Sequence, residues 1–225
     1  MPIQPFFPEP VTVSGNVAEA KHKVRVGFVR RVVLGHFLSA LLVFLSGWLV
    51  PPLIQFQVAA ALFVLGLVVL SMQRRLLNGG GKDNVSSLLI LVPTLFSLGQ
   101  ALFQTGSGGW PVVLLGSAVV GLALYATLCG NDFSYIGQFL ICSFTTIGTA
   151  AVVFGLGKCD WIHAVIGSTA AVTYLFYFAY DLSMIVKRRR LGEEVAAVAD
   201  LYRDLLNIVT YAPKVYFHWR KFRFI

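Results

Sequence analysis

Seven apolar stretches, each close to the length that crosses a lipid bilayer, decide what this chain can fold into. A membrane helix needs about 20 largely apolar residues. The seven stretches are Val32–Val50, Phe56–Met72, Val85–Phe103, Pro111–Cys129, Phe133–Leu156, Ile162–Val186 and Val195–Tyr216. Only 12% of the 225 residues are charged, against about 25% in ordinary soluble domains. The sequence therefore predicts one all-α, seven-helix membrane domain.

The expected domain covers residues 32–216 and is flanked by two short tails. Residues 1–31 hold four prolines among the first ten positions and end in a basic run. They predict a flexible tail followed by a basic cytosolic collar. Residues 217–225 are basic and aromatic, which is typical of an anchor at the membrane surface. No cleavable signal peptide is expected, so the first membrane helix would serve as the targeting signal.

Basic residues predict the orientation of the chain in the membrane. Five precede the first apolar stretch, three lie between the second and third, and four between the sixth and seventh. The loops expected on the other side hold only Lys158. The positive-inside rule then places the N-terminus in the cytosol. The side of the C-terminus stays open, because seven crossings would put Lys214 and Arg220 opposite to the rule. The net charge of +8 predicts contact with anionic lipid heads and no nucleic-acid partner.

The seventh stretch carries one polar face. Asp200, Arg203, Asp204, Asn207 and Tyr211 recur at steps of three or four, so a helix aligns them on one side. A charged residue in the bilayer centre costs roughly 2.5–3.5 kcal/mol, and is a functional hypothesis by default. We therefore expect this helix inside the bundle. Asp200 and Arg203, one turn apart, predict a local ion pair.

Four motifs, in order along the chain, resemble the Bax inhibitor 1 family, also called lifeguard or transmembrane Bax inhibitor motif proteins. They are Phe28–Val32 before the first helix, Asn131–Ser134 with Gly137 before the fifth, Tyr180–Leu182 in the sixth, and Leu201–Asn207 in the seventh. The likeness runs from about Val29 to Tyr216. Arg203 departs from it, since the family usually has an apolar residue at that position.

The resemblance implies six helices around a central polar seventh and a pH-sensitive calcium leak across an intracellular membrane. It also implies suppression of cell death. It assigns the pH sensor and transient calcium ligands to Asp181 and Asp204, and the arginine that engages them to Arg74 or its neighbour Arg75. The endoplasmic reticulum or Golgi is the expected location, with the plasma membrane as the alternative. Membrane lipids, calcium, protons and apoptosis-regulating membrane proteins are the expected partners.

The residues favour such a sensor on their own. Two carboxylates within hydrogen-bond reach cannot both ionise cheaply, so the pair holds a proton that neither would hold alone. The shared proton would brace the sixth and seventh helices together. Deprotonation would leave oxygen ligands of the kind that calcium prefers, with Asn207 as a neutral acceptor one turn on. The structural alternative is that these polar groups only join helices.

Other classes of function fit less well. An intramembrane aspartyl protease needs Gly-x-Gly-Asp where this chain has Leu201–Asp204, so no enzyme is expected. A retinal protein would use Lys214 as its Schiff base, but the four tryptophans lie near the ends of apolar stretches. The three cysteines and four histidines show no metal-ligand spacing, so no resident cofactor is expected. A non-conducting regulator that binds partner membrane proteins is the main alternative to the calcium leak.

Overall fold

The computed structural model describes residues 13–77, 83–104, 110–130 and 133–203, and these residues are helical with no strand. The elements are a 3-10 turn, six long helices and the first turns of a further helix at 194–203. The bounds are η1 Val17–Glu19, α1 His22–Trp48, α2 Phe56–Leu77, α3 Asp83–Gln104, α4 Trp110–Leu128, α5 Tyr135–Gly155 and α6 Trp161–Arg188. The predicted all-α class is confirmed.

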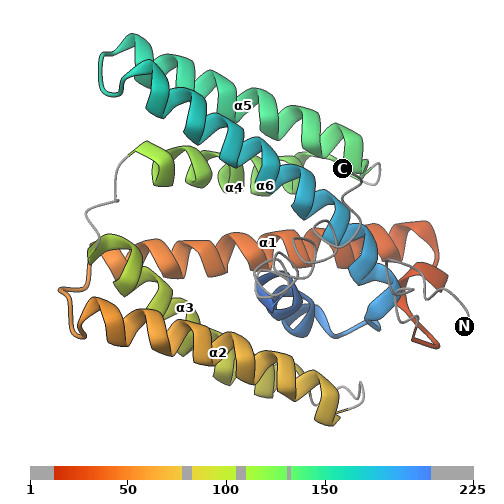
Figure 1. Ribbon diagram of the computed structural model, residues 1–225. Coiled ribbons are helices and arrows are strands. Elements are labelled where there is room, and N and C mark those ends of the chain that lie inside the picture. Colours follow the sequence, from red (N-terminus) through yellow and green to blue (C-terminus); the bar gives the residue numbers. More distant parts are fainter. Residues whose placement is uncertain (1–12, 78–82, 105–109, 131–132, 204–225) are drawn as a thin grey trace, which may run out of the picture.

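The long helices form two groups of three (Figure 1). In one group α3 packs against both α1 and α2, and in the other α4, α5 and α6 pack against one another. Helix α1 joins the groups through its contact with α4. The buried core includes Phe28, Leu95, Leu122 and Leu175, so it draws on both groups.

Local sequence explains where several helices begin and end. The hydroxyl of Ser134 accepts a hydrogen bond from the backbone N–H of Gly137 at 3.2 Å and caps α5. The carboxylate of Asp160 accepts from the backbone N–H of His163 at 2.8 Å and caps α6. Two consecutive prolines, Pro51 and Pro52, follow α1 and prevent its continuation.

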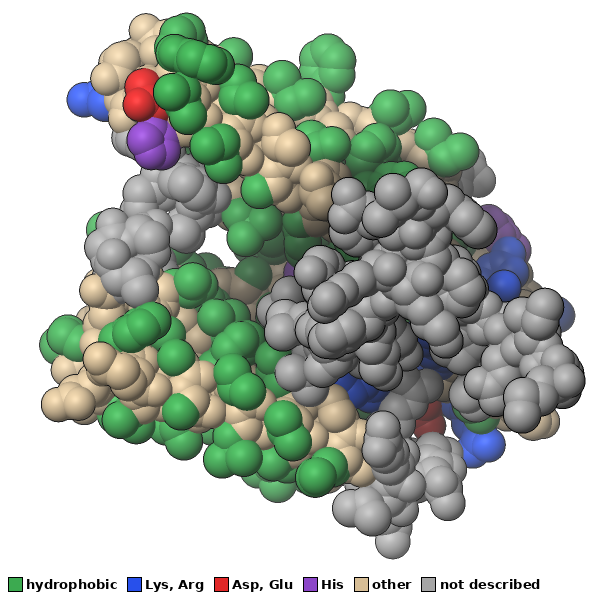
Figure 2. Space-filling model, in the orientation of Figure 1, with side chains coloured by type: hydrophobic (Ala, Val, Ile, Leu, Met, Phe, Trp, Pro, Cys, Tyr) green, Lys and Arg blue, Asp and Glu red, His purple; other side chains and the backbone are tan. Residues whose placement is uncertain are grey.

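The outer faces of the bundle are apolar. Five helices, α1, α2, α3, α5 and α6, are long and apolar enough to cross a membrane, and Val113–Leu128 in α4 is a shorter apolar helix. Large side chains such as Leu89, Ile136 and Phe144 are more than two-thirds exposed, at 71%, 73% and 84%. Figure 2 shows such side chains along the helices and basic side chains gathered at the right-hand end of the view. These surfaces fit a multi-pass membrane protein with lipid around it.

The boundary expected at residue 31 differs from the structure. Helix α1 begins at His22, so the basic residues from Lys23 to Arg31 lie in its first turns and not in a tail. Three apolar residues between them, Val26, Phe28 and Val29, are buried, which explains the earlier start. Val17 is fully buried as well, and its backbone N–H donates to the carbonyl of Arg189 at 2.9 Å. The segment before α1 is thus packed against the end of α6.

Candidate functional site

The helical segment 194–203 is enclosed by the bundle. Each of its residues is buried or half-buried, and Asp200 is 0% exposed. Its start is held by α3, because the side-chain oxygen of Asn84 accepts from the backbone N–H of Ala196 at 3.1 Å. On α1, the missing side chain of Gly35 lets Val198 approach, since a Cβ at Gly35 would lie 2.9 Å from Val198 Cγ2. The described part of the seventh helix is therefore internal, as the polar stripe predicts.

Asp200 is the centre of a buried ionic cluster. Arg189, directly after α6, donates to both of its carboxylate oxygens, from Nε at 2.8 Å and from Nη2 at 2.6 Å. Arg203 Nη1 lies 2.7 Å from Asp200 Oδ1 on the same helix, so the predicted one-turn ion pair is confirmed. Glu193 Oε2 lies 3.7 Å from Arg189 Nη1. Among the described residues, two arginines and two carboxylates meet here, and no side chain of the four is more than 8% exposed.

Arg189 and Glu193 are members of this cluster that sequence reasoning missed. Arg189 was expected among four cytosolic basic residues between the sixth and seventh helices, but it is only 5% exposed. It lies eleven residues before Asp200, but the helix is interrupted between them, so helix periodicity does not relate the two. The turn at 191–192, where Gly192 has a φ of 90°, folds the chain back and brings the two together. The only sequence signal is that turn between two charged segments.

Asp181 is buried in α6 at 3% exposure, as expected for an aspartate inside the bundle. It shares one face of the helix with Tyr174, Phe178 and Ile185, which stand three or four residues apart. Its expected partner, Asp204, and the neighbouring Asn207 lie outside the described residues. Arg74 and Arg75 lie in the last turns of α2, and their side chains fall outside the described part of the chain.

A polar group at the centre of the bundle continues this face of α6. His36 of α1 is 6% exposed, and its Nε2 bonds the hydroxyl of Tyr174. The ring of His36 also lies 5.4 Å from that of Tyr202, centroid to centroid. The hydroxyl of Tyr202 in turn lies 2.6 Å from Ser39 Oγ. Three helical elements thus meet at two hydrogen-bonded pairs, His36 with Tyr174 and Ser39 with Tyr202, which touch through the rings of His36 and Tyr202. His36 as an isolated residue did not predict this.

Within the described parts of the chain, no group of three or more His, Cys, Asp or Glu side chains is placed to hold a metal ion. Of the described carboxylates inside the bundle, Asp200 is held by arginines and Asp181 is buried in α6. This arrangement can store and exchange charge by protonation or by changing ion-pair partners. The contacts between the helices that carry these carboxylates therefore depend on the charge of the carboxylates.

Comparison with known proteins finds relatives among lifeguard proteins. The chain is 29% identical over 119 residues to Protein LIFEGUARD 2 of Arabidopsis thaliana, which covers 50% of this chain and 46% of that protein. It is 28% identical over 160 residues to Protein LIFEGUARD 1 of the same plant, covering 66% and 67%. It is also 28% identical over 100 residues to an uncharacterized membrane protein of Vibrio cholerae, covering 43% of each.

The chain spans about half the length of the first of these relatives. The same is true of Protein LIFEGUARD 3, of which 42% is covered. No family model matches the chain, and no solved structure matches it significantly.

Proposed function

From the premise that this chain is a relative, at the family level, of the lifeguard and Bax-inhibitor-1-like membrane proteins, we propose that it is a pH-sensitive calcium leak. The leak would lie in an intracellular membrane, in the endoplasmic reticulum or Golgi. It would lower stored calcium and thereby suppress cell death. Asp181 and Asp204 would form its sensor, with Arg74 or Arg75 as the basic partner of the closed state.

The burial of Asp181 in a membrane-spanning helix is the observation that carries the proposal. A carboxylate costs several kcal/mol in such a place, and intramembrane carboxylates mark ion and proton pathways. Asp181 is 3% exposed and lies one to two turns before the end of α6, near the basic end of the bundle. A second carboxylate brought close to it would force the two to share a proton.

The Asp200 cluster would hold the end of α6 and the segment 194–203 in a fixed position relative to each other. Arg189 belongs to the end of α6, and Arg203 belongs to the segment 194–203, so Asp200 joins these two elements from both sides. Asp204 follows Arg203 directly in the sequence. Because Arg189 and Arg203 already hold Asp200 in place, a change of charge at Asp181 and Asp204 would move the helices against a fixed joint. Calcium would bind only transiently, since a carboxylate pair offers few of the six to eight oxygens that it prefers.

The polar group around His36 lies on the same face of α6 as the proposed sensor. Tyr174 lies seven residues before Asp181 on the same face of α6, about 10 Å along the helix. Imidazole and hydroxyl groups both donate and accept hydrogen bonds, so His36 and Tyr174 can exchange a proton with each other inside the bundle.

Calcium flux from proteoliposomes tests the proposal. We expect a leak that changes between mildly acidic and mildly alkaline pH, and we expect Asp181→Asn to flatten that change. Asparagine keeps the shape of the side chain and removes its titration, so the effect reports on charge. The flux would be followed with an indicator dye across a pH series.

Asp160→Asn is the matched control. This carboxylate caps α6 outside the bundle, and asparagine caps helices equally well. The backbone N–H of His163 holds the pKa of the Asp160 carboxyl below its usual value, so it stays ionised through the tested range. The control should therefore keep the wild-type pH profile. If Asp181→Asn kept the full pH response, the role of Asp181 as sensor would be disproved. If folded wild-type protein gave no flux, the leak itself would be disproved and a non-conducting regulator favoured.

A further inference from the structure

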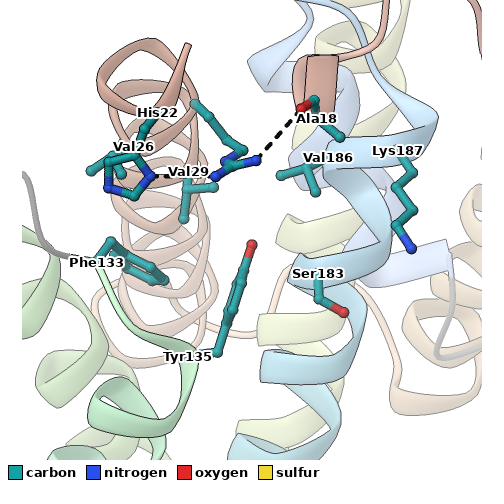
Figure 3. A pocket seen from close by; sticks show the side chains of 10 residues that line it. Ala18, His22, Val26, Val29, Phe133, Tyr135, Ser183, Val186 and Lys187 are labelled. Carbon is teal, nitrogen blue, oxygen red and sulfur yellow. Dashed lines mark hydrogen bonds between the residues drawn. The ribbon is translucent and has the colours of Figure 1, made fainter. Parts of the chain in front are cut away.

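Residues 13–20, which precede α1 and are called the N-terminal strap below, cap the end of α6. The backbone N–H of Val13 donates to the carbonyl of Lys187 at 3.2 Å, and that of Val17 donates to the carbonyl of Arg189 at 2.9 Å. Both acceptors lie at the C-terminal end of a helix, where carbonyls lack a partner within the helix. η1 packs against α6 as well as α1, and Figure 3 shows it beside the last turns of α6.

One apolar side chain anchors the N-terminal strap. Val17 is 0% exposed and belongs to the same buried core as Ile185 and Val186 at the end of α6. That core also includes Val198 of the segment 194–203. The strap, the end of α6 and the start of the last described helix therefore share one apolar core, although they lie far apart in the sequence.

Further hydrogen bonds hold the strap in its folded shape. The side-chain nitrogen of Asn16 donates to the carbonyl of Val13 at 2.8 Å and to Glu19 Oε1 at 3.0 Å. Arg190, just after α6, donates from Nε to the carbonyl of Ser14 at 3.2 Å. The side chain of Ser14 is exposed, so the outer side of the strap is accessible to other molecules.

Arg189 connects the strap to the Asp200 cluster. Its backbone carbonyl accepts from Val17, and its side chain donates to both carboxylate oxygens of Asp200. Arg189 is the first residue after α6, with an extended backbone that the helix does not fix. A shift of this backbone would carry the guanidinium with it. The position of the strap therefore affects the ionic contact between α6 and the segment 194–203.

We propose that the N-terminal strap regulates how firmly the segment 194–203 docks against the end of α6. While Val17 is in the core, the backbone of Arg189 is held and its bonds to Asp200 persist. When the strap leaves, the end of α6 loses its cap and the segment opens more often. Contacts built from few buried groups open at low free energy, so a partner or a modification acting on the strap can release it. That release also raises calcium flux rests on the proposed leak.

Hydrogen exchange of the detergent-purified, full-length protein, measured by mass spectrometry, tests the proposal. We expect Val17→Ala to speed exchange in peptides from 190–203 about tenfold, because the smaller side chain leaves part of its site in the core empty. Peptides from α2, which belongs to the other group of helices, are the internal reference and should exchange as in the wild type.

Val17→Pro tests the hydrogen bond to Arg189 separately, because proline has no N–H to donate. Val17 is the first residue of η1, and Asn16 before it is extended, so the backbone accepts proline at this position. This variant should also speed exchange in 190–203. Val24→Ala is the matched control, since Val24 lies in the first turn of α1 and is 44% exposed. It should leave the exchange unchanged.

Wild-type exchange in both Val17 variants would overturn the proposal. An increase as large for Val24→Ala, or an equal increase in the α2 peptides, would overturn it as well. Calcium flux from proteoliposomes holding the same variants separates the strap from the leak. Faster exchange with greater flux would support both. Faster exchange with no flux in any protein, wild type included, would support the strap and disprove the leak, and faster exchange with an unchanged, measurable flux would refute only the effect of the strap on the leak.

Discussion

At the scale of single residues, the Asp200 cluster shows why arginine is used where a lysine would not serve. A carboxylate that is fully shielded from water needs hydrogen-bond donors around it, and the planar guanidinium of Arg189 supplies two at once. Arg203 adds a third bond from the next turn of the same helix. Buried ion pairs contribute little net stability compared with apolar packing, but removal of one partner leaves an unpaired charge.

Asp200→Ala should therefore destabilise the protein by about 3–5 kcal/mol, because it leaves Arg189 and Arg203 buried without their anion. Chemical unfolding in detergent, followed by circular dichroism, measures the change. Glu194→Gln provides the comparison, since its pair with Arg31 is half in water, with side chains 22% and 57% exposed. That change should stay below about 1 kcal/mol. Similar values for the two variants would show that the Asp200 cluster is not an energetic joint.

At the scale of helices, close packing depends on particular glycines. A Cβ at Gly99 of α3 would fall on the backbone carbonyl oxygen of Val43 and on Ser46 Oγ, both in α1. A Cβ at Gly66 of α2 would overlap the side chain of Thr94 in α3. These two sites set how near α3 lies to its two neighbours. In membranes such small residues allow backbones to approach where no hydrophobic force drives them together.

Gly99→Ala should destabilise the protein by roughly 1–3 kcal/mol, because the backbone of α1 cannot move aside without losing its packing. Thermal unfolding of the purified protein in detergent gives the comparison. Gly116→Ala in α4 is the control, since a Cβ there meets nothing within 4 Å. It should be neutral or stabilising by up to about 1 kcal/mol, as alanine favours the helix. An equal loss at both positions would contradict the packing argument.

Helix positions followed closely from hydropathy, with one exception. The expected start at Phe56 and the structural start of α2 coincide, and α5 and α6 begin within two residues of their expected starts. Helix α1 begins ten residues before Val32, because its early turns alternate basic and apolar residues in a way that a search for unbroken apolar runs overlooks. Apolar residues in these turns are buried against other parts of the protein. A hydropathy search finds runs of residues suited to contact lipid, and so it misses them.

At the scale of the whole molecule, Arg30 helps to hold the two groups of helices together. Its guanidinium donates from Nε to the carbonyl of Ala126 at 2.6 Å, from Nη1 to that of Gly130 at 3.2 Å and from Nη2 to that of Thr127 at 3.4 Å. These carbonyls belong to the end of α4, where a helix leaves acceptors unsatisfied and favours a cation. One side chain of α1 thus caps a helix of the other group.

Arg30→Gln should destabilise the protein by roughly 1–2 kcal/mol, because two of the three hydrogen bonds lie near water and the third is better shielded. Arg31→Gln, at the adjacent position, removes the same charge and loses only the partly exposed pair with Glu194. Melting temperatures of the two variants, measured side by side, separate the capping role from net charge. A smaller loss for Arg30→Gln than for Arg31→Gln would refute the capping role.

The candidate site shows where sequence reasoning stops. Periodicity predicted the Asp200–Arg203 pair and an internal position for this helix, because both depend on spacing within one element. Arg189 and the bond between Ser39 and Tyr202 depend on how separate elements meet, which spacing along the chain does not encode. Charge counting placed Arg189 with its exposed neighbours, although packing selects that one arginine for burial.

The enclosed position of residues 194–203 has a consequence for how the protein is made. Ribosomes deliver the helices in order, so α1 to α6 leave the translocon before this segment does. Two arginines and two carboxylates entering lipid separately would each resist insertion. Asp200 and Arg203 arrive with the last of these elements, and Arg189 at the end of α6, which pairs with Asp200, is already in place when they do. The segment 194–203 therefore docks into a bundle whose first six helices are already present. A chain that stops before this step would leave the polar groups that the segment covers exposed, where cellular quality control can recognise them.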